Sequence, residues 1–147
     1  MSVAKSVLIV LTLAMIAAED PKKKDDAQAF QGNWSLVAMA VGGQPAPEAF
    51  IKQFRCKFEE KTYNNTIAGQ VVEEGSYTID PAKSPKAVDF DIKKGHDQGK
   101  KQLGIYKIEG DKLTLVLSEA GSTTRPDSFK IEAGSPLLEV VLERLKP

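Results

Sequence analysis

The chain has 147 residues, with 20 basic and 20 acidic side chains, so its formal charge is close to zero. This length suits one domain and is too short for two ordinary ones. A balanced charge gives no overall attraction to nucleic acid or to an anionic membrane surface, and neither is expected as a partner.

Residues 1–18 are typical of a secretory signal peptide. Lys5 precedes an apolar run of 12 residues, and the small residues Ala17 and Ala18 suit a cleavage site. A membrane span needs about 20 apolar residues, so no stable span is expected once this segment is removed. Retention as an uncleaved anchor is the alternative, because both kinds of segment share one physical pattern. We therefore expect export, to the periplasm or the extracellular space.

Residues 19–30 are expected to form a charged, solvated leader, and residues 31–147 to form the folded domain. The segment PKKKDDAQAF, residues 21–30, is rich in charge and poor in apolar side chains. Cys56 is the single cysteine, so no internal disulfide is possible and stability has to come from a packed core. Cys56 itself is expected to be a small buried hydrophobe.

The first expected strand covers residues 34–41. Alternate residues form its expected inner face: Trp34, Leu36, Ala38 and Ala40. Gly42 and Gly43 end the strand. Residues 47–54, PEAFIKQF, then predict one short helix with proline in its first turn.

The rest of the chain repeats short apolar alternation between turns. The expected strands cover residues 55–63, 66–80, 86–92, 103–108, 112–119 and 137–145. Asn64 and Asn65 are expected to form a turn, and Gly75 to mark a bulge or tight bend. The last segment suits helix as well as strand, and closure of the sheet favours strand. About eight strands predict an all-β, antiparallel up-and-down barrel, because closure removes exposed strand edges.

A glycine, a spacer and a tryptophan at the head of the first strand resemble the lipocalin barrel. The resemblance implies that Trp34 plugs the narrow end of the barrel and that Gly32 lets the chain pass close to the indole ring. It also implies that an arginine near the last strand covers the indole through a cation–π contact. Arg144 is the candidate by position, and Arg125 is the second choice.

Several spaced motifs between Gln31 and Phe129 resemble one subfamily more closely. They are EEG-Y-ID-P, PKA-D, G-Y---GD-L and RP--F, in that order along the chain. Together they are similar to the lipocalin-like domain that is abundant in planctomycete proteins. The resemblance implies an exported β-barrel and brings no settled activity with it.

The barrel interior is the generic binding site of such a fold. Its inward candidates are Leu36, Phe58, Tyr77, Phe90, Tyr106 and Leu115. Tyrosine hydroxyls offer polar handles for a mostly apolar ligand. One hypothesis is therefore an exported binding protein for a small apolar or amphipathic molecule. The other is a barrel filled by its own side chains, which serves a protein partner as an interaction or envelope-associated module.

No catalytic, metal or cofactor site is expected. His96 is the only histidine, and a metal site would require Asp97, Asp89 and Asp91 to converge on it. The adjacent acids Glu73 and Glu74 are expected to be one solvated residue and one at an edge. The sequence contains no nucleophile elbow and no phosphate-binding glycine loop. The chain is therefore not expected to be an enzyme.

Overall fold

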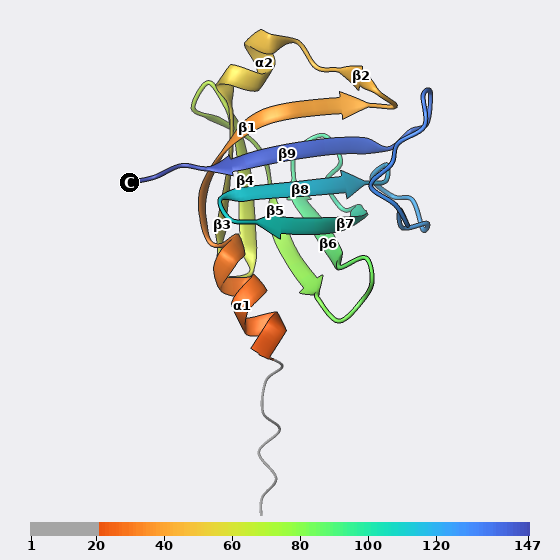
Figure 1. Ribbon diagram of the computed structural model, residues 1–147. Coiled ribbons are helices and arrows are strands. Elements are labelled where there is room, and N and C mark those ends of the chain that lie inside the picture. The colour runs from red at the N-terminus through yellow and green to blue at the C-terminus, as the bar shows by residue number, and fades with distance from the viewer. Residues whose placement is uncertain (1–20) are drawn as a thin grey trace, which may run out of the picture.

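The computed structural model describes residues 21–147, so the expected signal peptide lies outside the described residues. One antiparallel sheet has the strand order β2-β1-β3-β4-β5-β6-β7-β8-β9, and pairing of β1 with β9 closes eight strands into a barrel (Figure 1). The strands are β1 (Gly32–Val41), β2 (Gln44–Pro45), β3 (Phe54–Glu59), β4 (Thr62–Ile67), β5 (Gln70–Asp80), β6 (Ala87–Lys94), β7 (Lys101–Glu109), β8 (Lys112–Leu117) and β9 (Leu138–Arg144). The expected all-β up-and-down barrel is confirmed, and its last element is a strand.

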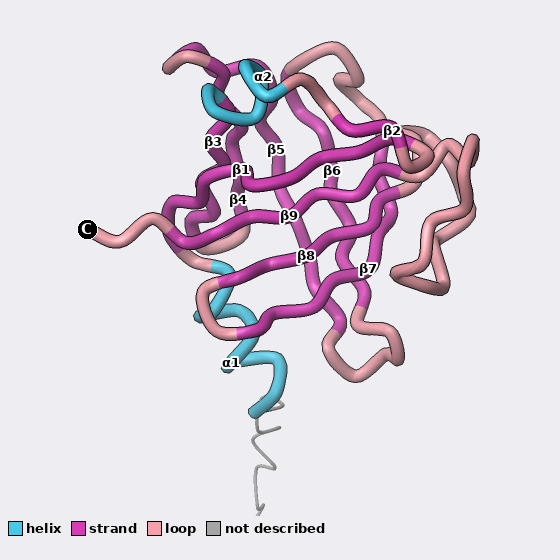
Figure 2. The backbone as a smooth tube through the Cα atoms, turned by 45° about the horizontal axis from the view of Figure 1, so that its top comes forward, coloured by secondary structure: helices cyan, strands magenta, loops and turns pink. Residues whose placement is uncertain are grey.

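Two short helices lie at opposite ends of the barrel, as Figures 1 and 2 show. Helix α2 (Glu48–Gln53) confirms the helix expected from PEAFIKQF. Helix α1 (Pro21–Phe30) was not expected. Within residues 21–147, neither helix is long and apolar enough to cross a membrane.

Helix α1 corrects the prediction of a solvated leader. Its last residue, Phe30, has no exposed surface. Three aromatic rings of the barrel surround it, with centroids 5.2, 5.5 and 4.9 Å away in Phe58, Tyr77 and Tyr106. Asp26 accepts a hydrogen bond of 2.7 Å from the Tyr106 hydroxyl and pairs with Lys86. The packed domain therefore begins before Gln31, because one aromatic and one acidic side chain tie a charged helix to the barrel.

A bulge in β1 corrects the expected inner face of that strand. Leu36 pairs with Leu142, but Ala38 pairs with Val141, so Val37 is an extra residue in β1. One extra residue moves every following side chain to the other face. Met39 therefore packs against the core in place of Ala38 and Ala40.

The turns were predicted with mixed success. Asn64 and Asn65 do not form a turn but lie within β4, and the chain reverses before them, at Glu60, whose φ is 52°. The bulge expected at Gly75 is confirmed, although the extra residue is Lys93 in the facing strand β6. A Cβ atom on Gly75 would lie 2.0 Å from a backbone carbonyl oxygen of β6, so only glycine fits there.

The end of the barrel beside α1 is closed by Trp34, which has no exposed surface. Its indole Nε1 donates a hydrogen bond of 2.9 Å to the Phe30 carbonyl oxygen. The Arg144 guanidinium carbon lies 4.4 Å from the centroid of the indole ring, and Arg144 also donates to the backbone carbonyls of Gln31 and Ala29. Arg144 thus holds the tryptophan and the end of α1 together.

The two other residues linked with this plug differ in their roles. Gly32 has a φ of 119°, and a Cβ atom there would lie 3.2 Å from Nη1 of Arg144, so glycine leaves room for the guanidinium. Arg125 lies elsewhere, because it pairs with Asp89 at 2.6 Å and donates to the carbonyls of Val88 and Gly104.

Candidate functional site

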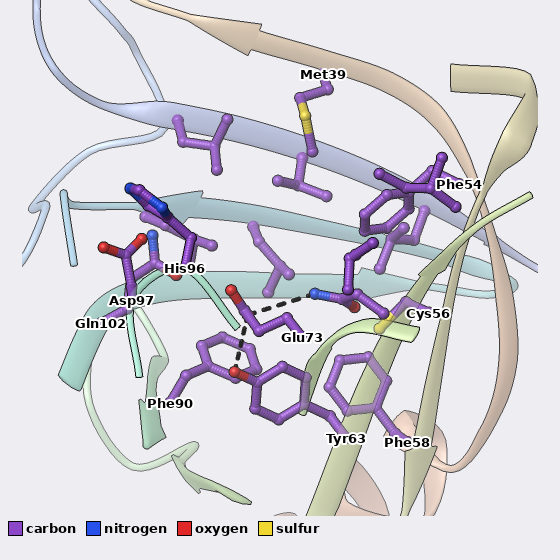
Figure 3. Close-up of a pocket in the computed structure, with 18 of the residues that line it drawn as sticks. Met39, Phe54, Cys56, Phe58, Tyr63, Glu73, Phe90, His96, Asp97 and Gln102 are labelled. Carbon is purple, nitrogen blue, oxygen red and sulfur yellow. Dashed lines mark hydrogen bonds between the residues drawn. The ribbon is translucent and has the colours of Figure 1, made fainter. Parts of the chain in front are cut away.

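The end of the barrel beside α2 contains a cavity of about 360 Å³ (Figure 3). All eight barrel strands and α2 contribute side chains to its lining. Most of the wall is apolar, as in Phe54, Phe58, Phe90, Leu115, Val140 and Leu142. The barrel is therefore closed and packed at the α1 end and hollow at the α2 end.

The six interior residues predicted from the sequence divide between these two ends. Phe58, Phe90 and Leu115 line the cavity. Leu36, Tyr77 and Tyr106 are buried core residues outside its lining, so their assignment to a ligand site is corrected. Both tyrosine hydroxyls point to the closed end, because they have protein partners there.

The partners of these hydroxyls explain the correction. The Tyr77 hydroxyl donates to the Glu60 carbonyl oxygen at 2.9 Å and accepts from the Gln31 side chain at 3.0 Å. Burial raises the pKa of Tyr77 to about 12, against the lowering effect of the Gln31 hydrogen bond. The Tyr106 hydroxyl donates to Asp26. Both hydroxyls are neutral and already hydrogen-bonded to the protein. They therefore stabilise the barrel and are not available to bind a ligand.

Among the polar side chains that line the cavity is Glu73 of β5, a residue assigned to the surface or an edge by sequence reasoning. Its Oε1 atom accepts a hydrogen bond of 2.9 Å from the Tyr63 hydroxyl and one of 3.5 Å from Nδ2 of Asn65 (Figure 3). Glu73 and Tyr77 lie four residues apart in one strand, so both face inwards. The expected inward position of Tyr77 was therefore the sequence signal from which the inward position of Glu73 could have been predicted.

A bulge shapes this part of the wall. Asn65 pairs with Glu73, but Thr66 pairs with Val71, so Val72 is an extra residue in β5. As a consequence, the consecutive residues Val72 and Glu73 both line the cavity. A strand without the bulge would turn one of the two away.

Burial dominates the electrostatics of the cavity. Desolvation raises the pKa of Glu73 above its usual range, the hydrogen bond from Tyr63 opposes this, and the charge of Asp97 adds to it. Desolvation and the charge of Glu73 also raise the pKa values of the Tyr63 phenol and the Cys56 thiol. The phenol and the thiol therefore stay neutral at ordinary pH, and Glu73 is the acid that titrates in the cavity wall.

The rim of the cavity carries His96 and Asp97, from the loop between β6 and β7. His96 is exposed, as expected for a loop histidine. Asp97 pairs with Lys100 at 3.0 Å, whereas Asp89 pairs with Arg125 and Asp91 lies 3.4 Å from Lys101. The four residues of the metal hypothesis do not converge, and residues 21–147 contain no group of three or more His, Cys, Asp or Glu arranged to hold a metal ion.

Comparison of the chain with protein-family models, with curated proteins and with solved structures finds no match. The function therefore has to be inferred from the cavity itself. Two properties of the cavity are decisive: its apolar wall and the carboxylate of Glu73, which is paired with no cation of the described residues.

Proposed function

We propose that this barrel binds a small, mostly apolar molecule in the cavity beside α2. The observation that carries the proposal is a cavity of about 360 Å³ at one end of an otherwise packed barrel. Ligand pockets in proteins start at about 300 Å³ and are lined mainly by apolar and aromatic side chains. An eight-stranded barrel is just narrow enough to be filled by its own side chains, so hollow space at one end is not imposed by the fold.

The apolar wall limits the class and the affinity of the ligand. Each methylene group moved from water into such a wall contributes about 0.8 kcal/mol. An eight-carbon chain therefore gains roughly 6 kcal/mol from burial alone, before the cost of association. Without a further polar contact, an affinity no tighter than micromolar is expected.

The alternative function is a filled barrel that acts as an interaction module for a protein partner. That function favours a packed centre and a contiguous apolar patch on the outer surface. The cavity supports ligand binding instead. The lipocalin resemblance points the same way, although a fold by itself is weak support for a function.

We also propose that the chain is exported, on the signal-like pattern of residues 1–18. Sequencing the N-terminus of the protein isolated from its host tests this point. A first residue of Ala18 or Glu19 is expected after cleavage. An intact N-terminus in the membrane fraction would instead favour the anchor.

A matched pair of substitutions in β9 tests ligand binding. Val140 lines the cavity, and its neighbour Val141 belongs to the opposite face of the same strand. The probe is N-phenyl-1-naphthylamine, a neutral apolar dye whose fluorescence rises in apolar surroundings. Val140→Phe fills the cavity, and Val141→Phe adds the same atoms outside it.

The wild-type protein and Val141→Phe are expected to take up the dye saturably with one site per chain. Val140→Phe is expected to weaken uptake about tenfold or more, while circular dichroism shows an intact barrel. Absence of saturable uptake by the wild type would overturn the proposal. An equal loss in both variants would place the dye outside the cavity and would overturn it as well.

A further inference from the structure

We propose that Glu73 makes this cavity selective for molecules that combine an apolar body with a protonated amine, which the Glu73 carboxylate binds. The inference rests on the proposed binding function and names the ligand class of the same cavity. Three observations support it: the charge of the lining, the unused oxygen of Glu73, and the groups around that oxygen.

The charge of the lining is negative. Among the described residues that line the cavity, the acids are Glu73 and Asp97, and none is a lysine or arginine. Asp97 is already paired with Lys100 at the rim. Glu73 takes part in none of the ion pairs within residues 21–147. The cavity therefore contains one carboxylate that no protein cation compensates.

An uncompensated carboxylate against an apolar wall is costly, and a ligand cation offsets that cost. Charges interact more strongly near a low-dielectric wall than in bulk water. A carboxylate that loses hydration is stabilised by an opposite charge with good hydrogen-bond geometry. A ligand ammonium supplies both in one group, which an alcohol or an ether does not.

The hydrogen bonds around Glu73 leave room for such a group. Both protein donors, Tyr63 and Asn65, reach Oε1, and no hydrogen bond from the described residues reaches Oε2. An ammonium group has three donors. Three acceptors lie on adjacent side chains: Oε2 of Glu73, the side-chain amide oxygen of Asn65 and the hydroxyl oxygen of Tyr63. The carboxylate points towards the middle of the cavity in Figure 3, where a ligand can reach it.

Aromatic rings below the carboxylate add to this preference. The rings of Tyr63 and Phe90 lie edge to face, with centroids 4.9 Å apart. The face of an aromatic ring attracts a cation that lies within about 6 Å of its centroid. The site thus combines a carboxylate with aromatic rings in the same lining, a combination that suits an ammonium better than an anion.

The pH dependence distinguishes an amine from a carboxylic acid. Glu73 interacts with Tyr63 and Asn65 from β4, with Cys56 from β3 and with Asp97 from the loop between β6 and β7, and His96 of that loop lies at the rim of the same cavity. Burial raises the pKa of Glu73, so its carboxylate forms only as the pH rises through that raised value. Amine affinity should therefore increase with pH until the amine itself loses its proton, near pH 10. A carboxylic acid bound to neutral Glu73 would show the opposite trend.

Displacement of N-phenyl-1-naphthylamine by three eight-carbon competitors tests the inference. The competitors are octylamine, octanol and octanoate, which each contain eight carbon atoms and differ in the head group, with the alkyl chain of octanoate one methylene shorter, a difference of about 0.8 kcal/mol, or about fourfold in affinity. The test variant is Glu73→Gln, which removes the charge and nearly preserves the shape. The matched control is Glu74→Gln, because Glu74 lies on the other face of β5 and approaches Lys94 at 3.7 Å.

The wild type and Glu74→Gln are expected to bind octylamine about tenfold or more tightly than octanol, since a hydrogen bond to a charged group has that effect. Glu73→Gln is expected to abolish this preference, and octanoate to be the weakest competitor. Equal displacement by octylamine and octanol, or preference for octanoate, would overturn the amine inference while dye uptake still supports a binding cavity. Absence of dye uptake by the wild type would overturn the binding function itself.

Discussion

Replacing Phe30 by alanine tests whether α1 is an integral part of the barrel. Phe30 has no exposed surface and packs against three aromatic rings. Removing a buried phenylalanine ring costs about 3–5 kcal/mol, and the better helix propensity of alanine returns only about 0.5 kcal/mol. In a domain of this size each kcal/mol lowers Tm by about 3–5 °C. Phe30→Ala should therefore unfold roughly 10–20 °C below the wild type.

Thermal unfolding followed by circular dichroism, together with urea unfolding, measures this loss. The control is Gln28→Ala, because Gln28 is exposed on the same helix and its replacement should change stability by less than about 0.5 kcal/mol. A loss below about 1 kcal/mol for Phe30→Ala would refute the reasoning. In that case α1 would contribute little to the domain, and the solvated-leader description would be energetically correct.

Three further predictions concern stability. Arg144→Lys loses the flat stack on the indole and the forked bonds to two carbonyls, so urea unfolding should show a cost of about 2–4 kcal/mol. The exposed Arg55 also donates to two carbonyls but stacks on no ring of the described residues, so Arg55→Lys should cost clearly less. Gly75→Ala places a Cβ atom against the Asp91 carbonyl oxygen, and a loss of about 3 kcal/mol or more is expected; a wild-type Tm would contradict the bulge geometry. Burial raises the pKa of Glu73, so the folded state holds that proton more tightly and the contribution of Glu73 to stability falls as the pH rises from about 4.3 through the raised value. Glu73→Gln lacks this fall, and urea unfolding at pH 4 and pH 8 should show its relative stability increasing with pH; a constant difference would be evidence against burial of the charge.

Period-two alternation was sufficient to predict the barrel. The clean patterns of β6 and β8 and the turns between strands gave an antiparallel sheet, and the edges of that sheet required closure. Trp34 at the head of β1 also suggested where the closed end lies. These features could be predicted because each depends on neighbouring residues in one strand.

Period-two alternation did not reveal the β-bulges, in which a strand contains a single extra residue. Val37 and Val72 are compatible with regular alternation, and only the pairing partners show that they are bulges. Met39 therefore entered the core unexpectedly. Helix α1 escaped for another reason, because its composition is that of a solvated segment and only the contacts of Phe30 and Asp26 attach it to the barrel.

The sequence predicted which side chains point into the barrel, but not how far along the barrel axis each one lies. Alternation correctly turned Tyr77 and Tyr106 inwards, but the height of a side chain along the barrel axis depends on strand tilt and register. Both tyrosines lie at the closed end for that reason. Glu73 lies on the same face as Tyr77, and it was overlooked because an acidic residue was assumed to be solvated.

The two ends of the barrel differ in how their polar groups are compensated, and this difference supports the proposal that a ligand binds beside α2. At the closed end the Trp34 indole, the Arg144 guanidinium and the Tyr106 hydroxyl all have protein partners. At the open end the apolar wall contains Glu73, whose pKa is raised because burial makes its charge unfavourable. An uncharged residue would stabilise the barrel more, and departures from optimal stability are expected where a protein acts. A ligand cation at Glu73 would remove the penalty, so octylamine should raise the Tm of the wild type more than that of Glu73→Gln.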